Sequence, residues 1–449
     1  LPGFKYSPDL MGVTNGQKYA PGWDFVFGSQ RDIRERAADN NWLVTTDALN
    51  QQWSKVKSDN QNYRVTVEPF DDLRIVLTAQ KQTATNTSAF FRYNDTLNGV
   101  GGFESQNEFT TETFSMSYYS LPSAFEALKA DNNYFSQVYQ DFLDNRIIVS
   151  ERLADQRVNS LQPGETYTKE LLDFPDSSAY GYRGYSVTSQ QVLIPAFLAA
   201  YGGEDPQSNK IGAKRDVPLP NWQINYDGLS KIKWFKKFFS SFTLNHAYRS
   251  TYNVNGITTN LLLQQALQDG DSLVDLNGDF LPEYQITGLS IAEQFAPLLG
   301  INTKLNNSIT VRLEYKKTRN INLSLSNNQL TETKGTEWVI GGGYIIKDVR
   351  LQFLKLGAKR MSPVSNLELK ADVGIRDNIT IIRKILEGID LPTAGQKVVT
   401  VKLSGDYQIS KRVTAKLFYD LNLSRFKTSN AYPITTHQFG LSVRLNLGQ

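Results

Sequence analysis

The segment 436–447, near the end of the chain, alternates two kinds of residue without exception. One side carries His437, Phe439, Leu441, Val443, Leu445 and Leu447, and the other carries Gln438, Gly440, Ser442, Arg444 and Asn446. A period of two predicts a β-strand with one apolar and one polar face. Ordinary strands have about 5–6 residues, whereas a tilted strand that crosses a bilayer needs about 9–11. The apolar face of such a strand meets either lipid or a protein core.

The same alternation recurs through the C-terminal half. Eight strands are predicted there, at 242–252, 286–301, 309–316, 338–346, 367–373, 399–409, 413–424 and 436–447. The connections 304–307 and 409–411 are short. Longer and polar connections are expected at 253–282, 326–335, 386–396 and 425–435, with 347–366 as an exception to the alternation of lengths. Short turns at one end of the strands and long loops at the other are typical of an up-and-down outer-membrane barrel.

Charged residues occupy the polar faces of these strands. They are Arg312, Glu314, Lys316, Lys402, Asp406, Lys416, Asp420 and Arg444. Burying an unpaired charge costs on the order of several kcal/mol, so we interpret this face as the wall of a water-filled lumen. A soluble β-sandwich with a solvated outer face remains open, although its strands would be shorter and spaced at about 8–12 residues.

Two residues contradict the simplest form of this interpretation. Lys317 and Arg319 fall on the apolar parity of their strand, where exposure to lipid at the bilayer midplane costs about 2–4 kcal/mol each. A bulge, a partner protein, or a strand that has already left the membrane at this height would each resolve the conflict.

Composition excludes several other classes of protein. The longest apolar runs, such as 194–200, are far shorter than the roughly 20 residues of a spanning helix, but a barrel needs apolar residues only at alternate positions. Aromatic residues make up 12% of the chain, which suits the aromatic girdles of barrels. The absence of cysteine removes disulfides and thiol chemistry. A net charge of +3 without a basic stripe predicts no nucleic-acid partner.

The N-terminal half is less regular, and the sequence divides into four predicted regions. Residues 1–60 form an irregular, plug-like or loop-like segment, 61–122 contain barrel strands, 123–220 form a helical and loop insertion, and 221–449 contain the C-terminal barrel strands with the closing strand 436–447. Tyr134, Val138 and Phe142 recur with helical spacing in the insertion, and a second helix is predicted at 189–200. We expect this insertion to cap or gate one side of the barrel.

Signals for catalysis or for a cofactor are weak. The two histidines, His246 and His437, lie at outward positions of predicted strands, where an interfacial role is commoner than general-base catalysis. The loop 271–279 places oxygen-bearing side chains like calcium ligands, at Asp271, Asp275, Asn277 and Asp279. It lacks the glycine at the sixth place and the glutamate at the twelfth place of an EF-hand, so both a solvated loop and a bound cation remain open. We therefore predict no enzyme activity and no cofactor.

One more cluster points to a membrane boundary. The segment 234–239 reads Trp-Phe-Lys-Lys-Phe-Phe and precedes a predicted strand. Aromatic rings sit at headgroup level and lysines extend toward water at such boundaries.

Several segments together resemble a known family. They are Val-Thr-Val-Glu-Pro-Phe-Asp-Asp-Leu at 65–73, Leu-Pro-Asn-Trp at 219–222, Ile-Ala-Glu-Gln-Phe-Ala-Pro-Leu at 291–298, Leu-Pro-Thr-Ala-Gly-Gln at 391–396, and the final strand. In these segments the chain resembles the SprA/Sov family, the outer-membrane translocons of the type 9 secretion system of Bacteroidetes. The resemblance covers the whole chain and is most specific from about 283 onward. Members of that family are several times longer, so this chain would be their C-terminal portion.

The resemblance implies an all-β membrane protein, the C-terminal part of a very large antiparallel transmembrane β-barrel with a partly helical cap. It implies passage of folded cargo proteins that carry C-terminal signal domains and, in some members, a role in gliding motility. The implied partners are the rest of the same barrel polypeptide, a PorV-type outer-membrane barrel, a periplasmic plug protein, periplasmic chaperone-like and prolyl-isomerase-like proteins, secreted cargo, and outer-membrane lipid or lipopolysaccharide. The implied location is the bacterial outer membrane, and the family has no catalytic residues to carry over.

The final strand also resembles the signal by which barrels are assembled, a polar residue, then glycine, then alternating apolar positions. The matching residues are Gln438, Gly440, Val443 and Leu445, although the usual terminal aromatic is missing. We expect this strand to pair with a strand outside this chain, because an unpaired edge in lipid is untenable. The alternative function is a non-transporting outer-membrane barrel that acts as a surface adhesin or glycan-binding protein. Channel conductance or cargo capture distinguishes the two.

Overall fold

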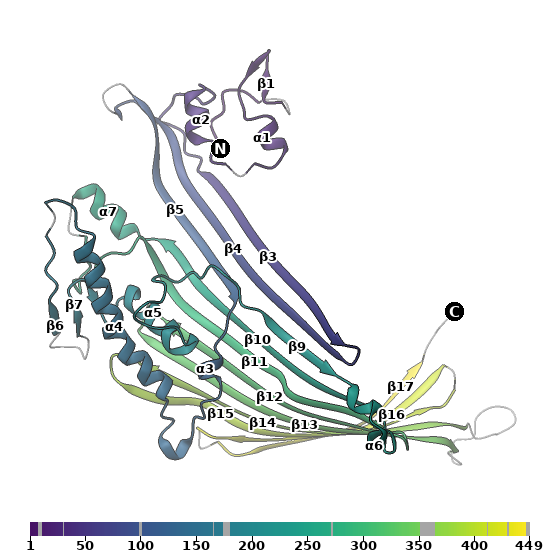
Figure 1. Ribbon diagram of the computed structural model, residues 1–449. Helices are drawn as coiled ribbons and strands as arrows, with labels where there is room; N and C mark the ends of the chain where they lie inside the picture. Colours follow the sequence, from purple (N-terminus) through teal and green to yellow (C-terminus); the bar gives the residue numbers. More distant parts are fainter. Residues whose placement is uncertain are drawn as a thin grey trace. The chain divides into compact units, whose positions relative to one another are not determined.

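The computed structural model describes residues 1–7, 11–29, 31–97, 101–164, 166–173, 180–270, 273–350, 364–410, 412–428 and 431–445. The chain folds into two compact units. Unit 1 contains 1–61, 81–115 and 254–287, and unit 2 contains 62–80, 116–253 and 288–449. Long antiparallel strands dominate both units, so the fold class is all-β with a partly helical insertion, as the sequence predicts (Figure 1).

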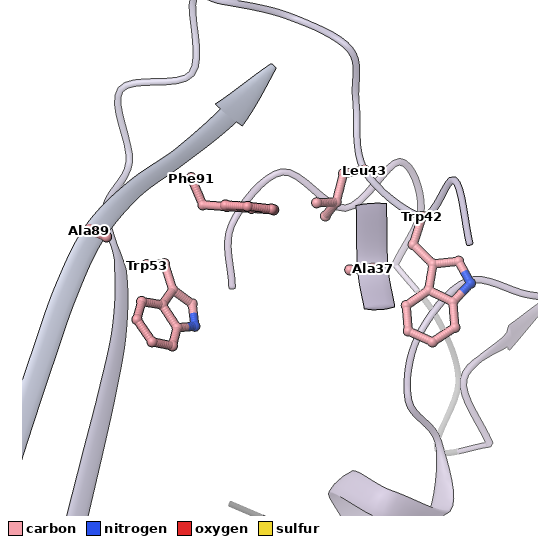
Figure 2. Packing of buried hydrophobic residues seen from close by; sticks show 6 residues of the cluster. All are labelled: Ala37, Trp42, Leu43, Trp53, Ala89 and Phe91. Atoms are coloured by element: carbon pink, nitrogen blue, oxygen red, sulfur yellow. The ribbon is translucent and has the colours of Figure 1, made fainter. Parts of the chain in front are cut away.

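Unit 1 has a small core of its own. Its short elements are β1 (Val13–Thr14), β2 (Gln17–Lys18), α1 (Trp23–Val26), α2 (Arg34–Asp39) and α7 (Leu261–Asp269). Figure 2 shows Ala37 of α2 together with Trp42, Leu43, Trp53, Ala89 and Phe91, which are all buried. Arg34 lies 3.9 Å above the ring of Trp53, which combines a cation–π contact with shielding of the ring from water. The predicted irregular segment 1–60 is therefore partly ordered, and its last residues already belong to β3.

The main sheet is built from long strands. Their bounds are β3 (Trp53–Phe70), β4 (Leu73–Asn94), β5 (Gly102–Ser117), β9 (Asn221–Tyr226), β10 (Phe239–Thr259), β11 (Tyr284–Leu305), β12 (Ile309–Ser324), β13 (Gln329–Arg350), β14 (Val364–Lys384), β15 (Ile389–Gln408), β16 (Val413–Phe426) and β17 (Ile434–Leu445). The hydrogen-bonded order is β17-β16-β15-β14-β13-β12-β11-β10-β5-β4-β3. Sequential antiparallel neighbours from β10 to β17 correspond to the eight strands predicted from the alternation.

Two predicted loops are wrong. Residues 326–335 and 386–396 lie mostly in strands, because β12 and β13 are joined by the tight turn 325–328 and β14 and β15 by 385–388. Alternation in hydropathy stops there because both faces of these strand ends carry polar residues. The connections at 253–282 and 425–435 are also shorter than expected, since β10 extends to Thr259 and β16 to Phe426. Most of the exceptional connection, 351–363, lies outside the described residues.

The insertion leaves the sheet at one strand position and returns at the same position. β9 pairs with residues 244–248 of β10 and with 73–78 of β4, and β5 is the other element between β10 and β4 in the sheet order. Where β5 ends, Ser117 O accepts a hydrogen bond from Leu219 N at 3.0 Å. Gln80 N donates to Ser117 Oγ at 3.0 Å. Residues 118–220 are thus a detour between two halves of one interrupted strand.

We call residues 118–220 the cap. It contains α3 (Leu121–Ala124), η2 (Ala130–Asn132), α4 (Gln137–Asn159), α5 (Gln190–Gly202), and the short strands β6 (Leu171–Asp173), β7 (Tyr180–Tyr182) and β8 (Tyr185–Ser186). α5 is apolar around its whole circumference and is almost entirely buried, which is expected of a helix enclosed by its neighbours. None of the helices in the described ranges is long and apolar enough to span a bilayer.

Candidate functional site

The strand register places all eight predicted lumen residues on one face of the sheet. Arg312, Glu314 and Lys316 of β12 share this face with Glu337 of β13. The row then continues through directly opposed residues on the following strands. These pairs are Asp372–Lys402, Lys402–Asp420, Asp406–Lys416 and Thr414–Arg444. The first three of these pairs are opposite charges, and each such pair directly across an antiparallel ladder is worth about 0.2–1 kcal/mol. That this face borders a lumen remains a prediction.

Some of these charges are paired while keeping access to solvent. Glu314 accepts a hydrogen bond from Arg312 Nε at 2.7 Å, and Lys316 Nζ lies 3.2 Å from its other oxygen. The Arg312 side chain is 52% exposed. Such partly exposed pairs contribute about 0–1 kcal/mol each, so this face is organised for contact with water and not for stability.

The opposite face carries a continuous apolar band over one half of each strand. Its exposed members on unit 2 include Val311, Trp338, Ile340, Tyr344, Leu369, Leu403, Leu417, Leu423, Phe439, Leu441, Val443 and Leu445. On β13 the band runs from Trp338 to Ile346, about 26 Å of strand at about 3.3 Å per residue. A tilted strand that crosses a bilayer needs about 9–11 residues, and the nine residues 338–346 match that length. A contiguous exposed area of this kind marks a surface that contacts lipid or another protein.

The two anomalous basic residues lie on this same face, beyond the apolar band and under the cap. Lys317 lies 4.5 Å from the ring of Phe125, and Arg319 is opposed to Glu293 across the β11–β12 pair. β12 and its neighbours extend well past the band, and the cap covers their outer face there. A bulge does interrupt β11 between Phe295 and Leu299, next to Lys317, but β12 stays in register, so both basic residues keep their face. The cap of the same chain covers them in place of a partner protein, and departure of the strand from the membrane at this height stays a prediction.

A group of charged side chains is buried between these strand ends and the cap. We call it the buried ionic cluster, and its members are Glu293, Arg319, Glu332, Lys334 and Arg383. Glu332 and Arg383 are 0% exposed. Register places the cluster on adjacent strands at similar heights, since Arg319 is opposed to Lys334 and Leu330 to Arg383.

Arg319 and Glu293 form the first part of the cluster. Arg319 Nη2 lies 2.9 Å from Glu293 Oε2, and both side chains are 2% exposed. The guanidinium donates to the backbone carbonyls of Ser123 at 2.6 Å and Ser120 at 3.0 Å. Glu293 Oε1 accepts from Ser120 Oγ at 2.7 Å and from Tyr248 Oη at 2.8 Å. Every charge in this pair is thereby matched, as burial requires.

Lys334 connects the sheet to the start of α4. Its Nζ lies 3.0 Å from Glu332 Oε1 and donates to the backbone carbonyl of Glu126 at 3.1 Å. The Glu126 carboxylate accepts from Ser136 Oγ at 2.7 Å and from Val138 N at 3.2 Å, at the N-terminus of α4. Ser136 itself caps the helix by accepting from Tyr139 N. A carboxylate at this end is also favoured by the helix dipole.

Arg383 completes the cluster on β14. It donates to the backbone carbonyl of Tyr134 at 3.0 Å and pairs with Asp390 of β15. Its guanidinium lies 5.0 Å from the ring of Tyr139, a cation–π contact with α4. Burial raises the pKa of the Tyr139 phenol to about 12. Three consecutive strands therefore each provide a basic side chain that donates hydrogen bonds to backbone carbonyls of the cap segment 120–134. These side chains are Arg319, Lys334 and Arg383.

Sequence reasoning did not identify this cluster. A signal was present in the sequence. Charged residues replace apolar ones on the apolar face of two neighbouring strands at nearly the same level, namely Lys317 and Arg319 on β12 and Glu332 and Lys334 on β13. Only the register shows that these interruptions coincide.

The other sequence candidates have structural roles. His246 Nδ1 lies 2.7 Å from the carbonyl of Leu298, and His437 Nδ1 lies 3.0 Å from Tyr419 Oη. The Asp275 carboxylate accepts from the backbone of Asn277 and Asp279, which closes a turn, while Asp271 lies outside the described residues. Within the described ranges no group of three or more acidic or histidine side chains is arranged to hold a metal.

The closing strand β17 is an edge of the sheet in the described chain, and it pairs with β16 alone. Gln438 and Gly440 lie on the polar face, and Val443 and Leu445 are exposed on the apolar face. A Cβ at Gly440 would come within 2.6 Å of the Phe418 ring on the facing strand. Gly440 thus makes room for an aromatic ring that covers it, a known way of supporting glycine in a strand. Residues 446–447 of the predicted strand lie outside the described residues.

Comparison with known proteins adds little. No family model and no curated protein matches the chain. Among solved structures, the trimer form of in-vitro folded OmpT, an outer membrane protein of Vibrio cholerae, is 10% identical over 87% of this chain and 99% of that chain, with a TM-score of 0.21. A second OmpT structure is 8% identical over 87% and 97%, also with a TM-score of 0.21. At these TM-scores neither likeness carries an argument about this chain.

Proposed function

We propose that this chain forms part of the wall of a bacterial outer-membrane translocon that passes folded proteins through a water-filled conduit. The observation that carries the proposal is the division of unit 2 into two faces. One face is charged and solvated, and the other carries an exposed apolar band whose length along β13 matches that of a membrane-crossing strand. Transport of this kind needs no catalytic chemistry from the wall.

The apolar band supports placement in a membrane. Leaving Trp338, Ile340, Leu403 and Leu441 in water would expose a large apolar surface that favours aggregation. Burying each such side chain is worth about 1.5–3 kcal/mol, and lipid is the environment that covers the whole band at once. Long strands with alternating parity are the barrel solution for crossing it, because all backbone hydrogen bonds are made between strands.

The charged face supports a wide aqueous route. Acidic and basic residues alternate across β14, β15 and β16, so the face has no strong single sign that would hold one cargo tightly. The resemblance of the sequence to the SprA/Sov family suggests cargo proteins with C-terminal signal domains. It also suggests the partner proteins of the type 9 system.

The cap suits a role at the rim of the conduit. It is fixed to the strand ends beyond the apolar band by the buried ionic cluster and by the packing of Ala124 against Tyr248 and Phe295. A structured element at this height is in a position to contact partners or cargo without interrupting the wall. The proposal therefore assigns transport to the wall and recognition to the cap.

The test uses the full-length protein purified from membranes. We expect it to require detergent, to conduct ions in planar bilayers once any plugging partner is removed, and to co-purify with secreted proteins. A monodisperse, folded preparation without detergent would contradict the membrane assignment. Membrane insertion with neither conductance nor captured cargo would instead favour the adhesin or glycan-binding alternative.

A further inference from the structure

An aromatic and lysine-rich collar lies at the end of β10 that is remote from the cap. It spans η3 (Gly228–Lys231), α6 (Lys233–Lys236) and the start of β10. We define the collar by Trp234, Phe235, Phe238, Phe239, Phe242, Lys233, Lys236 and Lys237.

The aromatic rings of the collar form one continuous group. Trp234 lies 5.1 Å from Phe235 and 5.7 Å from Phe238, and Phe235 lies 5.3 Å from Phe242. Trp234 is 61% exposed and Phe238 is 52% exposed. Phe242 has the same parity on β10 as His246 and Tyr248. The Tyr248 ring lies 4.9 Å from that of Phe295, which shares the face of Lys317 and of the apolar band. The collar thus continues the apolar surface to its edge.

The backbone of the collar is held in place by the neighbouring turn. Asn306, between β11 and β12, donates from Nδ2 to the carbonyls of Lys236 at 3.2 Å and Lys237 at 3.0 Å. Asn306 N donates to the carbonyl of Phe238 at 3.1 Å. These bonds fix the collar, so its exposed rings and lysines are displayed by a rigid turn.

The three collar lysines carry unmatched positive charge. Lys231, just before them, pairs with Asp72, but Lys233, Lys236 and Lys237 make no ion pair with any residue in the described part of the chain. All three are exposed. Exposed aromatic rings beside unpaired lysines are complementary to a membrane boundary, where an apolar layer adjoins negatively charged headgroups.

We propose that the collar is a binding site for the headgroups of anionic phospholipids, with Trp234 and Phe238 inserted at headgroup level and the three lysines contacting lipid phosphates. The inference rests on the proposed membrane location and names the lipid class that this edge of the wall selects. A lysine near an anionic membrane surface favours binding about fivefold, or about 1 kcal/mol. Three lysines together therefore give a selectivity on the order of 100-fold.

The test measures lipid that remains with the full-length protein. The protein is reconstituted in vesicles of phosphatidylcholine and phosphatidylglycerol at a ratio of about four to one, re-extracted in mild detergent, and its retained lipid is quantified by mass spectrometry. We expect phosphatidylglycerol to be enriched over the bulk ratio. The triple variant Lys233→Gln, Lys236→Gln and Lys237→Gln should return the ratio to that of the bulk.

A matched control removes three exposed lysines elsewhere. Lys18→Gln, Lys57→Gln and Lys129→Gln together change the net charge equally and should keep the enrichment. Trp234→Ala should lower the total lipid retained without changing the ratio. Enrichment that survives in the collar variant, or is lost equally in the control, would overturn the inference. Failure of the protein to enter vesicles would count against the proposed function instead.

Discussion

Replacing Arg319 with methionine is expected to loosen the cap while leaving the wall folded. Arg319 and Glu293 are both 2% exposed and lie 2.9 Å apart. Removing one member of a buried pair costs about 3–5 kcal/mol, because the other charge stays buried without a partner. The carbonyls of Ser120 and Ser123 also lose their donor. If the free energy of local opening of the cap falls by this amount, the fraction of molecules with an open cap rises roughly 100- to 5,000-fold.

Hydrogen exchange of the full-length protein in detergent measures this opening. Amides of α3 and α4 should exchange faster by that factor, whereas amides of β15 and β16 should keep their protection. Arg312→Met is the matched control, because Arg312 lies on the same strand and also pairs with a glutamate, Glu314, but its side chain is 52% exposed. The Glu314 side chain is only 9% exposed, but it keeps Lys316 Nζ at 3.2 Å after the change. Because the carboxylate stays paired and Arg312 is partly solvated, exchange of the cap amides should change by less than about tenfold.

A double variant separates the buried charge from the rest of the effect. Glu293→Met combined with Arg319→Met removes both charges, so the penalty of an unpaired carboxylate disappears. We expect it to recover about 2 kcal/mol relative to Arg319→Met, while the two unpaired carbonyls keep it less protected than wild type. Equal exchange in Arg319→Met and Arg312→Met, or a double variant less protected than Arg319→Met alone, would refute the reasoning.

Three further predictions concern the band, the cap and the charged face. Leu403→Arg, on the apolar face, should destabilise the barrel by about 2–4 kcal/mol and lower the heat-modifiable folded form on gels, whereas Ser404→Arg on the polar face should have little effect. The neutral Tyr139 phenol, whose pKa burial raises to about 12, should contribute stability below pH about 10 that is lost as pH rises through 12; tyrosinate absorbance at 295 nm and cap exchange in Tyr139→Phe check this. Lys402→Glu with Lys416→Glu should shift ion selectivity toward cations in bilayer recordings without reducing the amount of protein assembled.

The long strands were largely predictable from the sequence. Within the apolar band, each face of a strand keeps one kind of surroundings, apolar on one side and polar on the other. Where lipid or core faces one side and water the other, a two-residue period persists, and the segments 399–409 and 413–424 show it clearly. The helices of the cap were also predictable in part, since Val138 and Phe142 repeat with helical spacing and lie in the helix that runs from Gln137 to Asn159. Tyr134, predicted on the same helical face, precedes the helix and has a positive φ of 57°.

The strand ends under the cap were not predictable in the same way. There the face that carries the apolar band is covered by the cap, so Glu332 and Lys334 occupy positions that are apolar further along the strand. The sequence pattern then resembles a loop, which is why 326–335 is predicted as one. A residue-by-residue pattern reports the environment of a face and not the secondary structure itself, and the environment here is created by a segment about 200 residues earlier in the chain.

For a related reason, the sequence did not show which residues of the sheet the cap packs against. Arg319, Lys334 and Arg383 bind backbone carbonyls of the segment 120–134, and carbonyls are present at every residue whatever the side chain. Charge patterns in the cap sequence therefore give no sign of the basic residues that hold it. Only Glu126, which meets Lys334, carries a complementary charge among the described contacts of these three residues with the cap.

The interrupted strand formed by β5 and β9 makes the cap a separable module. Because the insertion departs after Ser117 and rejoins before Asn221 at one position of the wall, the order of strands on either side does not depend on what the insertion contains. Changes in length or sequence at such a point leave the wall's pairing untouched. Evolution can then change the cap while the pairing of the long strands is preserved, and a short linker in place of 118–218 would offer the same freedom to the experimenter.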